Sequence, residues 1–410
     1  MSNVKGLKCI SCGRKYEVEG MQYICEECGG NLEVIYNYKE IASRLTRESL
    51  AKDTDYSVWR YWDLLPLSDR SNIMPLQIGW TPLYRTERLE KKLGLKSLYL
   101  KDDGRNPSGS FKDRASSVAI CKALELGFDV IAGASTGNAA SSTACLGASL
   151  GISPTIFVPA AAPEAKVAQL LVFGATVYAV QGTYDEAFDL CTEICAEYGW
   201  FNRNTGYNPY TREGKKTVSF EICEQLGWEV PDTVLVPVGD GNIISGVWKG
   251  FKDLKVVGLI DRLPRLVAVQ SDKSSAVVDA LLGDGKVRPI EATTVADSIS
   301  VDLPRDGEAA VKAVKESNGT GILVSDEKIL QSILTIARGA GIFGEPAGVT
   351  AYAGLEKMRE EATIGDDETV VCLVTGNGLK DVKSAIKVAG NPISIQPTLD
   401  SFREVSGSRT

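Results

Sequence analysis

The sequence predicts an α/β protein with two doubly wound domains, preceded by a small cysteine-rich segment. After residue 97, short continuous apolar runs such as DTVLVPVG alternate with helical stretches of about 10 to 15 residues. Apolar runs of this kind are typical of parallel strands that helices cover on both faces. In contrast, Cys9, Cys12, Cys25 and Cys28 all fall within one opening segment that is too short to build its own core.

The composition is that of a folded protein with two or three domains, since 44% of the 410 residues are hydrophobic and 24% are charged. A net charge of −8 and a pI near 5.0 provide no broad attraction to nucleic acid or to acidic membranes. No apolar run approaches the roughly 20 residues that cross a bilayer, and MSNVKGLK lacks the apolar stretch of a signal peptide. We therefore expect a cytoplasmic protein without a nucleic acid or membrane partner.

The chain contains no histidine. This excludes the serine and cysteine triads, the HExxH zinc sites and every imidazole general base. Any catalysis must therefore use Lys, Asp, Glu, Tyr or Cys side chains, or a cofactor.

The opening segment, residues 1–37, is predicted to be a zinc ribbon. Two C-x-x-C-G turns contain Cys9 with Cys12 and Cys25 with Cys28. Four thiolates at this spacing can surround one zinc ion tetrahedrally, and a complete set of four leaves no open position for catalysis. The alternative is a ribbon that has lost its metal or has oxidised to disulfides.

The elements after the ribbon divide into a large and a small domain. Residues 38–69 are predicted to form a polar, helical connection to the main body. The strand and helix pairs that follow begin with SLYLKDD and SFKDRASSVAICKALELG, then DVIAGAS and NAASSTACLGASLG, and the alternation continues to TVVCLVTGN. We assign residues 38–98 and 204–395 to the large domain, 99–203 to a smaller mobile domain that closes over the site, and 396–410 to a loosely structured tail.

Three loops between a strand and a helix are candidate ligand sites, because ligands bind at the carboxyl ends of parallel strands. They are NPSGSFKDR after LYLKDD, ASTGN after DVIAG, and GDGNI after VLVPV. Each joins small residues to a following helix, where free backbone N–H groups can bind a phosphate. Any one of these loops alone is more often an ordinary turn.

A dinucleotide site at the third loop is one alternative, because Asp261 lies about 20 residues further on, where a ribose-binding acid is expected. However, GDGNIISG is not G-x-G-x-x-G, and Asp261 precedes the next strand instead of following it. We therefore favour one ligand that contacts all three loops.

Pyridoxal phosphate is a ligand that would use all three loops. It needs an amine for a Schiff base, a phosphate cradle, a donor to its ring hydroxyl and a partner for its ring nitrogen. Lys112, between a glycine- and serine-rich turn and a predicted helix, can supply the amine. A free lysine has a pKa of about 10.4, and burial or a helix N-terminus would disfavour its ammonium form. The alternative is an ordinary surface lysine that begins a helix.

The motifs NPSGSFKDR, ASTGN, VPVGDGNI, EGKKT and VTGNGLKD, in this order behind a cysteine ribbon, resemble those of the threonine synthase family. The segments WTPLYRTERL and GEPAG extend the resemblance from about Cys9 to Lys387. It implies the fold type II of pyridoxal-phosphate enzymes, similar to the tryptophan synthase β chain. It also implies a homodimer that converts O-phospho-L-homoserine and water to L-threonine and phosphate.

The resemblance also implies roles for individual residues. Lys112 would hold the cofactor and move protons, with Phe111 beside it. Asn138 would bind the ring hydroxyl, and Thr375 would face the ring nitrogen. The cofactor phosphate would lie on Gly239, Asp240, Gly241, Asn242 and Ile243. The phosphate of the substrate would lie on Ser135, Thr136, Lys166 and Asn204.

The sequence departs from the family pattern at three positions. The family pattern G-N-x-G-N-I has an asparagine at the position of Asp240, and a carboxylate beside a phosphate would repel it unless it points away. The arginine expected in NSxNPxRxEGQKT is Thr211, with Arg212 one place later, and the usual histidine of T-G-H-G is Asn377.

These departures leave other functions open. One is a threonine or serine ammonia-lyase, and another is a synthase that replaces phosphate with a sulfur nucleophile, similar to cysteate synthase. A third, from a different class, is a zinc-dependent binding protein whose α/β body has lost its activity.

Overall fold

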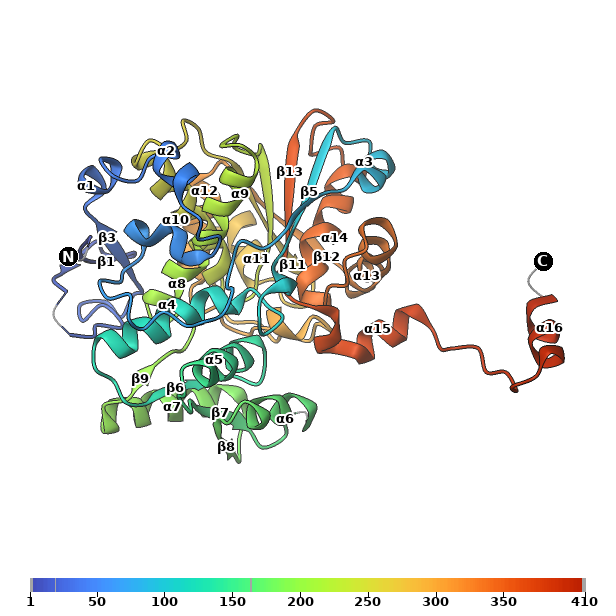
Figure 1. Cartoon of the computed structure of the whole chain (residues 1–410), viewed down its shortest axis with the longest axis horizontal. Coiled ribbons are helices and arrows are strands. Elements are labelled where there is room, and N and C mark those ends of the chain that lie inside the picture. Colours follow the sequence, from blue (N-terminus) through green and yellow to red (C-terminus); the bar gives the residue numbers. More distant parts are fainter. Residues whose placement is uncertain (1–2, 19, 163, 408–410) are drawn as a thin grey trace.

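The computed structural model describes residues 3–18, 20–162 and 164–407, and the chain forms three separate sheets. The first sheet belongs to the cysteine-rich segment and has the order β2-β1-β3, with antiparallel neighbours. Its strands are β1 (Val4–Cys9), β2 (Lys15–Tyr16) and β3 (Leu32–Tyr36). This small unit lies at one end of the body, near the N-terminus in Figure 1.

The large sheet has six strands in the order β12-β11-β10-β13-β5-β4, all parallel except the edge strand β4. They are β4 (Leu83–Arg85), β5 (Ser97–Asp102), β10 (Thr233–Pro237), β11 (Arg265–Ser271), β12 (Thr320–Val324) and β13 (Thr369–Val374). Val234 and Val236 pack into one apolar cluster, and Leu235 between them packs into another. Both faces of the sheet are therefore buried, as the continuous apolar strands predict.

The small sheet has four parallel strands in the order β8-β7-β6-β9. They are β6 (Ile131–Ala134), β7 (Thr155–Pro159), β8 (Thr176–Val180) and β9 (Phe201–Asn202). This sheet and its helices form the lower lobe in Figure 1. With two helix-covered parallel sheets, the predicted α/β class is confirmed.

Helices of very different lengths surround these sheets. In chain order they are α1 (Tyr38–Ala42), α2 (Arg47–Lys52), α3 (Glu87–Leu93), α4 (Lys112–Glu125), α5 (Asn138–Ser149), α6 (Glu164–Val172), α7 (Tyr184–Tyr198), α8 (Tyr210–Lys215), α9 (Thr217–Gln225), α10 (Asn242–Val256), α11 (Ala276–Leu282), α12 (Gly307–Glu316), α13 (Asp326–Ala340), α14 (Pro346–Glu360), α15 (Val382–Ala389) and α16 (Leu399–Gly407). None of them, within the described ranges, is both long and apolar enough to cross a membrane.

The sheets place one domain boundary differently from the prediction. The predicted start of the small domain, residue 99, falls inside β5, and the whole of β5 pairs with β13 in the large sheet. The small sheet itself begins at Ile131. The alternation of strands and helices along the chain cannot reveal this, because membership of a sheet depends on pairing between distant segments.

The connection after the ribbon is part of the core. Besides α1 and α2 it contains a 3-10 turn, Val58–Leu64, in which Val58, Tyr61 and Leu64 are completely buried. The predicted polar connection is therefore a packed element that joins the ribbon to the large domain.

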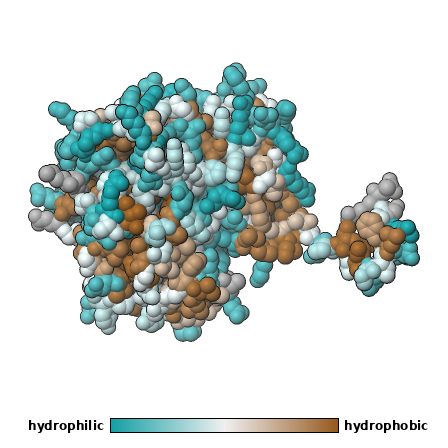
Figure 2. Space-filling view, viewed as in Figure 1, coloured by the Kyte–Doolittle hydropathy of each residue, from teal (hydrophilic) through white to brown (hydrophobic). Residues whose placement is uncertain are grey.

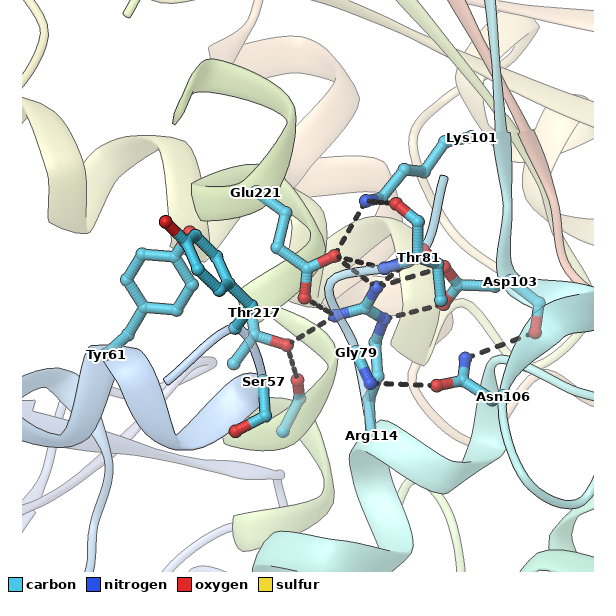
Figure 3. Close-up of polar contacts among 12 residues, drawn as sticks. Ser57, Tyr61, Gly79, Thr81, Lys101, Asp103, Asn106, Arg114, Thr217 and Glu221 are labelled. Atoms are coloured by element: carbon cyan, nitrogen blue, oxygen red, sulfur yellow. Dashed lines mark hydrogen bonds and ion pairs between the residues drawn. The ribbon is translucent and has the colours of Figure 1, made fainter. Parts of the chain in front are cut away.

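A buried ionic cluster fixes the first turn of α4 to the large domain (Figure 3). Arg114 donates to both oxygens of Glu221 and to both oxygens of Asp103, at 2.5 to 3.0 Å. Lys101 donates to Glu221 from the other side at 2.7 Å. The helix α8 also approaches α4 closely, because a Cβ on Gly214 would lie only 1.8 Å from the carbonyl oxygen of Arg114. These contacts hold the residue two places before Arg114, which is Lys112.

Candidate active site

Lys112 begins α4 at the border between the two lobes. The preceding residue, Phe111, is buried, and its N–H donates to the carbonyl oxygen of Thr375 at 2.9 Å. Thr375 directly follows β13, so this hydrogen bond joins two loops that lie far apart in the sequence. The structure thus brings three predicted cofactor residues together.

The amine of Lys112 has no hydrogen-bond or ion-pair partner in the part of the chain that the structure describes. Burial lowers the pKa of Lys112 below its ordinary value, and the positive charge of Arg203 lowers it further. The carboxylates of Asp240 and Glu345 oppose this shift. The neutral amine is the nucleophilic form, so this environment favours attack on an aldehyde.

Two neighbouring cavities share Lys112. The larger, of about 360 Å³, also contains Asn138, Ser135 and Thr136 on its wall. The smaller is lined by Lys112 and by the loop of residues 239–243. The amine therefore lies between the second and third predicted loops, as one shared ligand requires.

The loop of residues 239–243 has the geometry of an anion cradle. Gly241 has a left-handed conformation with φ of 86°, and it caps α10, whose first residue is Asn242. The free N–H groups and the positive end of the helix dipole favour a phosphate there. Lys215 is completely buried beside this loop and donates to Oδ1 of Asn242. Among the described residues no carboxylate forms an ion pair with Lys215. Burial lowers the pKa of Lys215 well below its ordinary value, and the charges of Lys112 and Arg203 lower it further. A phosphate bound beside it would favour its charged form.

Asp240 does not point away from the cavities, since it lines both. Its Oδ1 accepts a hydrogen bond from the N–H of Arg305 at 3.3 Å. Burial raises the pKa of Asp240, while the nearby charges of Lys112 and Lys215 oppose the shift. The charges of these two lysines oppose the repulsion that a carboxylate would exert on a phosphate.

Asn138 begins α5 and donates from Nδ2 to Oε1 of Glu345 at 2.7 Å. Glu345 directly precedes α14 and is buried. Burial raises the pKa of Glu345 to about 7, against the opposing effects of Lys380 and of the bond from Asn138. A carboxyl group with this pKa can exchange a proton near neutral pH.

The predicted substrate residues divide into three groups. Ser135 and Thr136 line the 360 Å³ cavity. Lys166 lines an adjoining cleft of about 980 Å³ and pairs with Asp297 at 2.5 Å. Asn204 lines neither space, because its Oδ1 accepts from the N–H of Ala134 at 2.7 Å. Its amide side chain holds two adjacent strands together.

The sequence also departs from the family pattern at Thr211 and Asn377. Neither of these residues, nor Arg212, places a positive charge in the cavities. Thr211 is buried and donates to the carbonyl oxygen of Asn208 at 2.8 Å. Arg212 turns away from the cavities and pairs with Asp306 at 2.5 Å. Asn377 lines the adjoining cleft, and its Oδ1 caps a 3-10 turn by accepting from the N–H of Leu379.

Sequence reasoning missed three charged residues of this site, which are Arg203, Lys215 and Glu345. Each lies inside or beside a motif that the sequence presents, since Arg203 precedes Asn204, Lys215 is in EGKKT and Glu345 is in GEPAG. The sequence did contain one indication of a site residue, because Arg203 is a charged residue that directly follows an apolar strand. Only the folded chain shows that all three are buried.

The arrangement fits pyridoxal phosphate. The partly buried amine of Lys112 and the amide of Asn138 line the 360 Å³ cavity. The glycine loop lines a second cavity that also includes Lys112, and Lys215 donates to Asn242 of this loop. Lys112 could hold the aldehyde carbon, residues 239–243 with Lys215 the phosphate, and Asn138 and Thr375 the ring. As a group these residues match what the cofactor requires.

The four cysteines of the ribbon also meet as predicted. Their Sγ atoms all lie within 4.8 Å of one another. Cys9 to Cys28 is 3.5 Å and Cys12 to Cys25 is 3.6 Å, much longer than the roughly 2.05 Å of a disulfide. Around zinc with bonds of about 2.3 Å, tetrahedral thiolates lie about 3.8 Å apart, so the cluster suits this metal.

Comparison with known proteins identifies the family. Residues 74–376 match the family model described as pyridoxal-phosphate dependent enzyme. Threonine synthases of Methanocaldococcus jannaschii and Methanosarcina acetivorans are each 41% identical over 401 residues, which cover 97% of this chain and 98% of each relative.

Solved structures share the fold at lower identity. Maize serine racemase superposes with a TM-score of 0.66 at 21% identity, over 80% of this chain and 94% of the other. Threonine deaminase isoform 2 of Solanum lycopersicum superposes with a TM-score of 0.62 at 22% identity, over 80% and 82%. The chain therefore belongs to the pyridoxal-phosphate-dependent enzyme family of fold type II and, within it, to the threonine synthase family.

Proposed function

We propose that this enzyme converts O-phospho-L-homoserine and water to L-threonine and phosphate. The observation that carries the proposal is the amine of Lys112, which is partly buried, has no partner among the described residues and lines two cavities, in a chain that is 41% identical to threonine synthases over nearly its full length. A protein that only binds zinc or a partner would have no use for such an amine.

The cofactor, when bound, withdraws electrons from the substrate carbons next to the nitrogen that it holds. Lys112 then removes and returns protons at the α and β carbons, and its lowered pKa favours the neutral amine that acts as the base. Thr375 offers a hydroxyl to the ring nitrogen, and a hydroxyl does not enforce protonation as a carboxylate would. This restraint favours elimination and replacement over other reactions of the cofactor.

The rim of the site joins the two lobes. Lys166 of α6 pairs with Asp297, and Asp185 of α7 pairs with Arg305 at 2.9 Å. We propose that the lobe with the small sheet moves at these contacts, and that it closes while the phosphate leaves and one water molecule enters.

The ribbon and the tail complete the proposal. We propose a structural zinc ion on the four cysteines, with no open position for a substrate. We also propose a homodimer in the cytoplasm, because α16 stands apart from the body with Leu399 and Phe402 more than half exposed (Figures 1 and 2). A second copy of the chain would cover such an apolar surface.

The decisive experiment removes the amine. In Lys112→Ala we expect no phosphate release from phosphohomoserine and no cofactor that borohydride can fix to the protein. The control is Lys91→Ala, an exposed lysine of α3, which should keep both properties. Full turnover in the Lys112 variant would refute the proposal.

The same assay separates the alternatives. Wild-type protein should release phosphate from phosphohomoserine, whereas an ammonia-lyase would release ammonia from threonine or serine. A sulfur-transferring synthase would release phosphate from phosphoserine only when sulfite is added.

A further inference from the structure

Arg203 occupies a favoured ligand position of the small sheet. It directly follows β9, and its N–H donates to the carbonyl oxygen of Ala132 in the neighbouring strand β6 at 2.8 Å. Because β6 and β9 are parallel, Arg203 lies beside the loop that follows β6 and leads to α5. Ligands bind at the carboxyl ends of adjacent parallel strands.

The guanidinium of Arg203 is buried without a counter-ion. Its residue is only 2% exposed, and its hydrogen bonds go to hydroxyl groups alone. Nε and Nη2 donate to Oγ of Ser116 at 3.3 and 3.0 Å, and Nη1 donates to Oγ1 of Thr205 at 3.0 Å. No carboxylate within the described ranges forms an ion pair with it, and burial lowers the pKa of Arg203 to about 10.

Two N–H groups of Arg203 remain without an acceptor in the described part of the protein. An arginine has five N–H donors, and three serve Ser116 and Thr205. Burying a cation is unfavourable unless an anion accompanies it. The free donors therefore point to an anionic ligand that binds when the enzyme works.

The cavity beside Arg203 suits such an anion. Arg203 lines the 360 Å³ cavity together with Lys112, Ser135 and Thr136. Four carboxylates also line it, of which Asp297 pairs with Lys166 and Asp185 with Arg305, while the others are Asp240 and Asp302. The loop of Ser135 and Thr136 leads into the N-terminus of α5, whose dipole also attracts negative charge. Arg305 lines the same cavity but pairs with Asp185, so its charge is already offset.

Arg203 also supplies a charge that the expected position lacks. The family arginine of NSxNPxRxEGQKT is Thr211 here, and Arg212 pairs with Asp306 away from the cavity. Arg203 directly follows β9, whereas Thr211 lies in the first turn of α8. Of the two arginines, Arg203 lines the 360 Å³ cavity and Arg212 does not.

We propose that Arg203 binds the phosphate of the substrate and so restricts the enzyme to phosphorylated amino acids. This inference rests on the proposed function and names the residue that recognises the leaving group. Two adjacent N–H groups match two oxygens of a phosphate, and the low polarity of the site strengthens both bonds. Ser116 and Thr205 orient the guanidinium, and Thr205 also lines the 360 Å³ cavity, whereas Ser116 does not.

The test measures binding of inorganic phosphate to the holoenzyme by calorimetry. In Arg203→Met we expect the Kd for phosphate to rise about 10- to 100-fold, because charge-assisted hydrogen bonds are lost. Arg203→Lys keeps the positive charge but lacks the paired N–H donors of the guanidinium, so it should give an intermediate Kd for phosphate. The cofactor spectrum should stay unchanged in Arg203→Lys, which keeps the charge, whereas Arg203→Met removes a charge that lowers the pKa of Lys112 and can shift the spectrum with pH. A control is Arg288→Met, an exposed arginine paired with Asp284.

A second comparison distinguishes the phosphate from the α-carboxylate of the substrate. We measure competition by phosphohomoserine and by homoserine, which differ only in the phosphate. Arg203→Met should weaken the binding of phosphohomoserine and leave the binding of homoserine unchanged. Equal weakening of both would assign Arg203 to the carboxylate and overturn the proposal, as would an unchanged Kd for phosphate or no phosphate binding by the wild type.

Turnover of phosphohomoserine and binding of phosphate can succeed or fail independently. If the wild type shows no turnover of phosphohomoserine but binds phosphate through Arg203, the proposed reaction fails and the anion site stands. If turnover occurs and Arg203→Met has wild-type KM and phosphate affinity, the anion site fails and the reaction stands. Thr205→Val, which removes a support of the guanidinium, serves if Arg203→Met does not fold, and it should raise the Kd for phosphate by a smaller factor.

Discussion

At the scale of single residues, Glu221 holds a buried carboxylate between two cations (Figure 3). Arg114 and Lys101 both donate to it, and all three side chains are completely buried. The opposite charges lower the pKa of Glu221 to about 2, although burial alone would raise it. The cluster stabilises the turn that carries Lys112.

Glu221→Gln tests this cluster through its dependence on pH. The pKa of Glu221 is lower in the folded than in the unfolded protein, so its stabilisation is complete above about pH 4.5 and disappears as the pH falls toward 2. A shift of this size corresponds to about 3 kcal/mol of unfolding free energy. We expect the variant to be less stable at pH 7 by an amount of this order and to approach the wild type at pH 3, measured by urea unfolding.

The control for this prediction is Glu361→Gln, a surface residue that is half exposed and that pairs only with Lys357. It should change the unfolding free energy by less than about 0.5 kcal/mol at either pH. An equal gap between Glu221→Gln and the wild type at both pH values would contradict the assigned role of the charge.

At the scale of elements, the ribbon contacts two segments that adjoin the active site. Asn31 donates from Nδ2 to Oδ1 of Asp306 at 2.8 Å, and Asp306 accepts from Nδ2 of Asn242 in the phosphate loop at 2.8 Å. On the other side, the N–H of Asn202 donates to the hydroxyl of Tyr23 at 2.8 Å. The ribbon therefore supports both the phosphate loop and the strand that leads to Arg203.

We predict that Asn31→Ala weakens cofactor binding although it leaves the four cysteines intact. The bond to Asp306 is charge-assisted, and its loss frees a carboxylate that orients Asn242. The expected rise in the Kd for pyridoxal phosphate is about 5- to 10-fold, measured by absorbance titration of protein freed of cofactor.

Removal of the metal by a chelator should have the same effect on the wild type, because the short ribbon loses its support without zinc. Asn391→Ala, in the exposed tail, is the matched control and should bind the cofactor normally. If Asn31→Ala keeps its zinc and binds the cofactor as tightly as the wild type, the ribbon does not support the loop.

At the scale of the whole molecule, the last segment extends away from the body (Figure 1). Ile393 and Ile395 are nearly half exposed, and Leu399 and Phe402 are more exposed still. In Figure 2 the apolar colour gathers on α16, which stands apart from the rest of the chain. Apolar side chains gathered in this way are typical of a surface that a partner covers.

Deletion of residues 391–410 should shift the protein from dimer to monomer. The reason is that the tail exposes apolar area which a second copy would bury. Light scattering after gel filtration should give about twice 44.1 kDa for the full chain and about one truncated chain for the deletion variant. A full-length monomer would contradict the dimer, and a dimeric deletion variant would place its interface elsewhere. Ile393→Ala, a single change, should leave the dimer intact.

The sequence by itself determined the α/β class, the four-cysteine site and the position of Lys112. These depend on local features, since the apolar runs, the C-x-x-C spacing and the loop before a helix are all contained in short segments. The motifs around Asn138 and residues 239–243 were equally visible, and the structure does place these segments around cavities that share Lys112.

Only the tertiary structure decided which sheet each strand joins and which charges lack a partner. β5 belongs to the large sheet because it pairs with β13, which lies more than 260 residues away in the sequence. Arg203 and Lys215 are buried, and within the described ranges neither forms an ion pair with a carboxylate, whereas the buried Arg212 pairs with Asp306. Pairing and burial depend on distances between remote segments, and no local pattern records those distances.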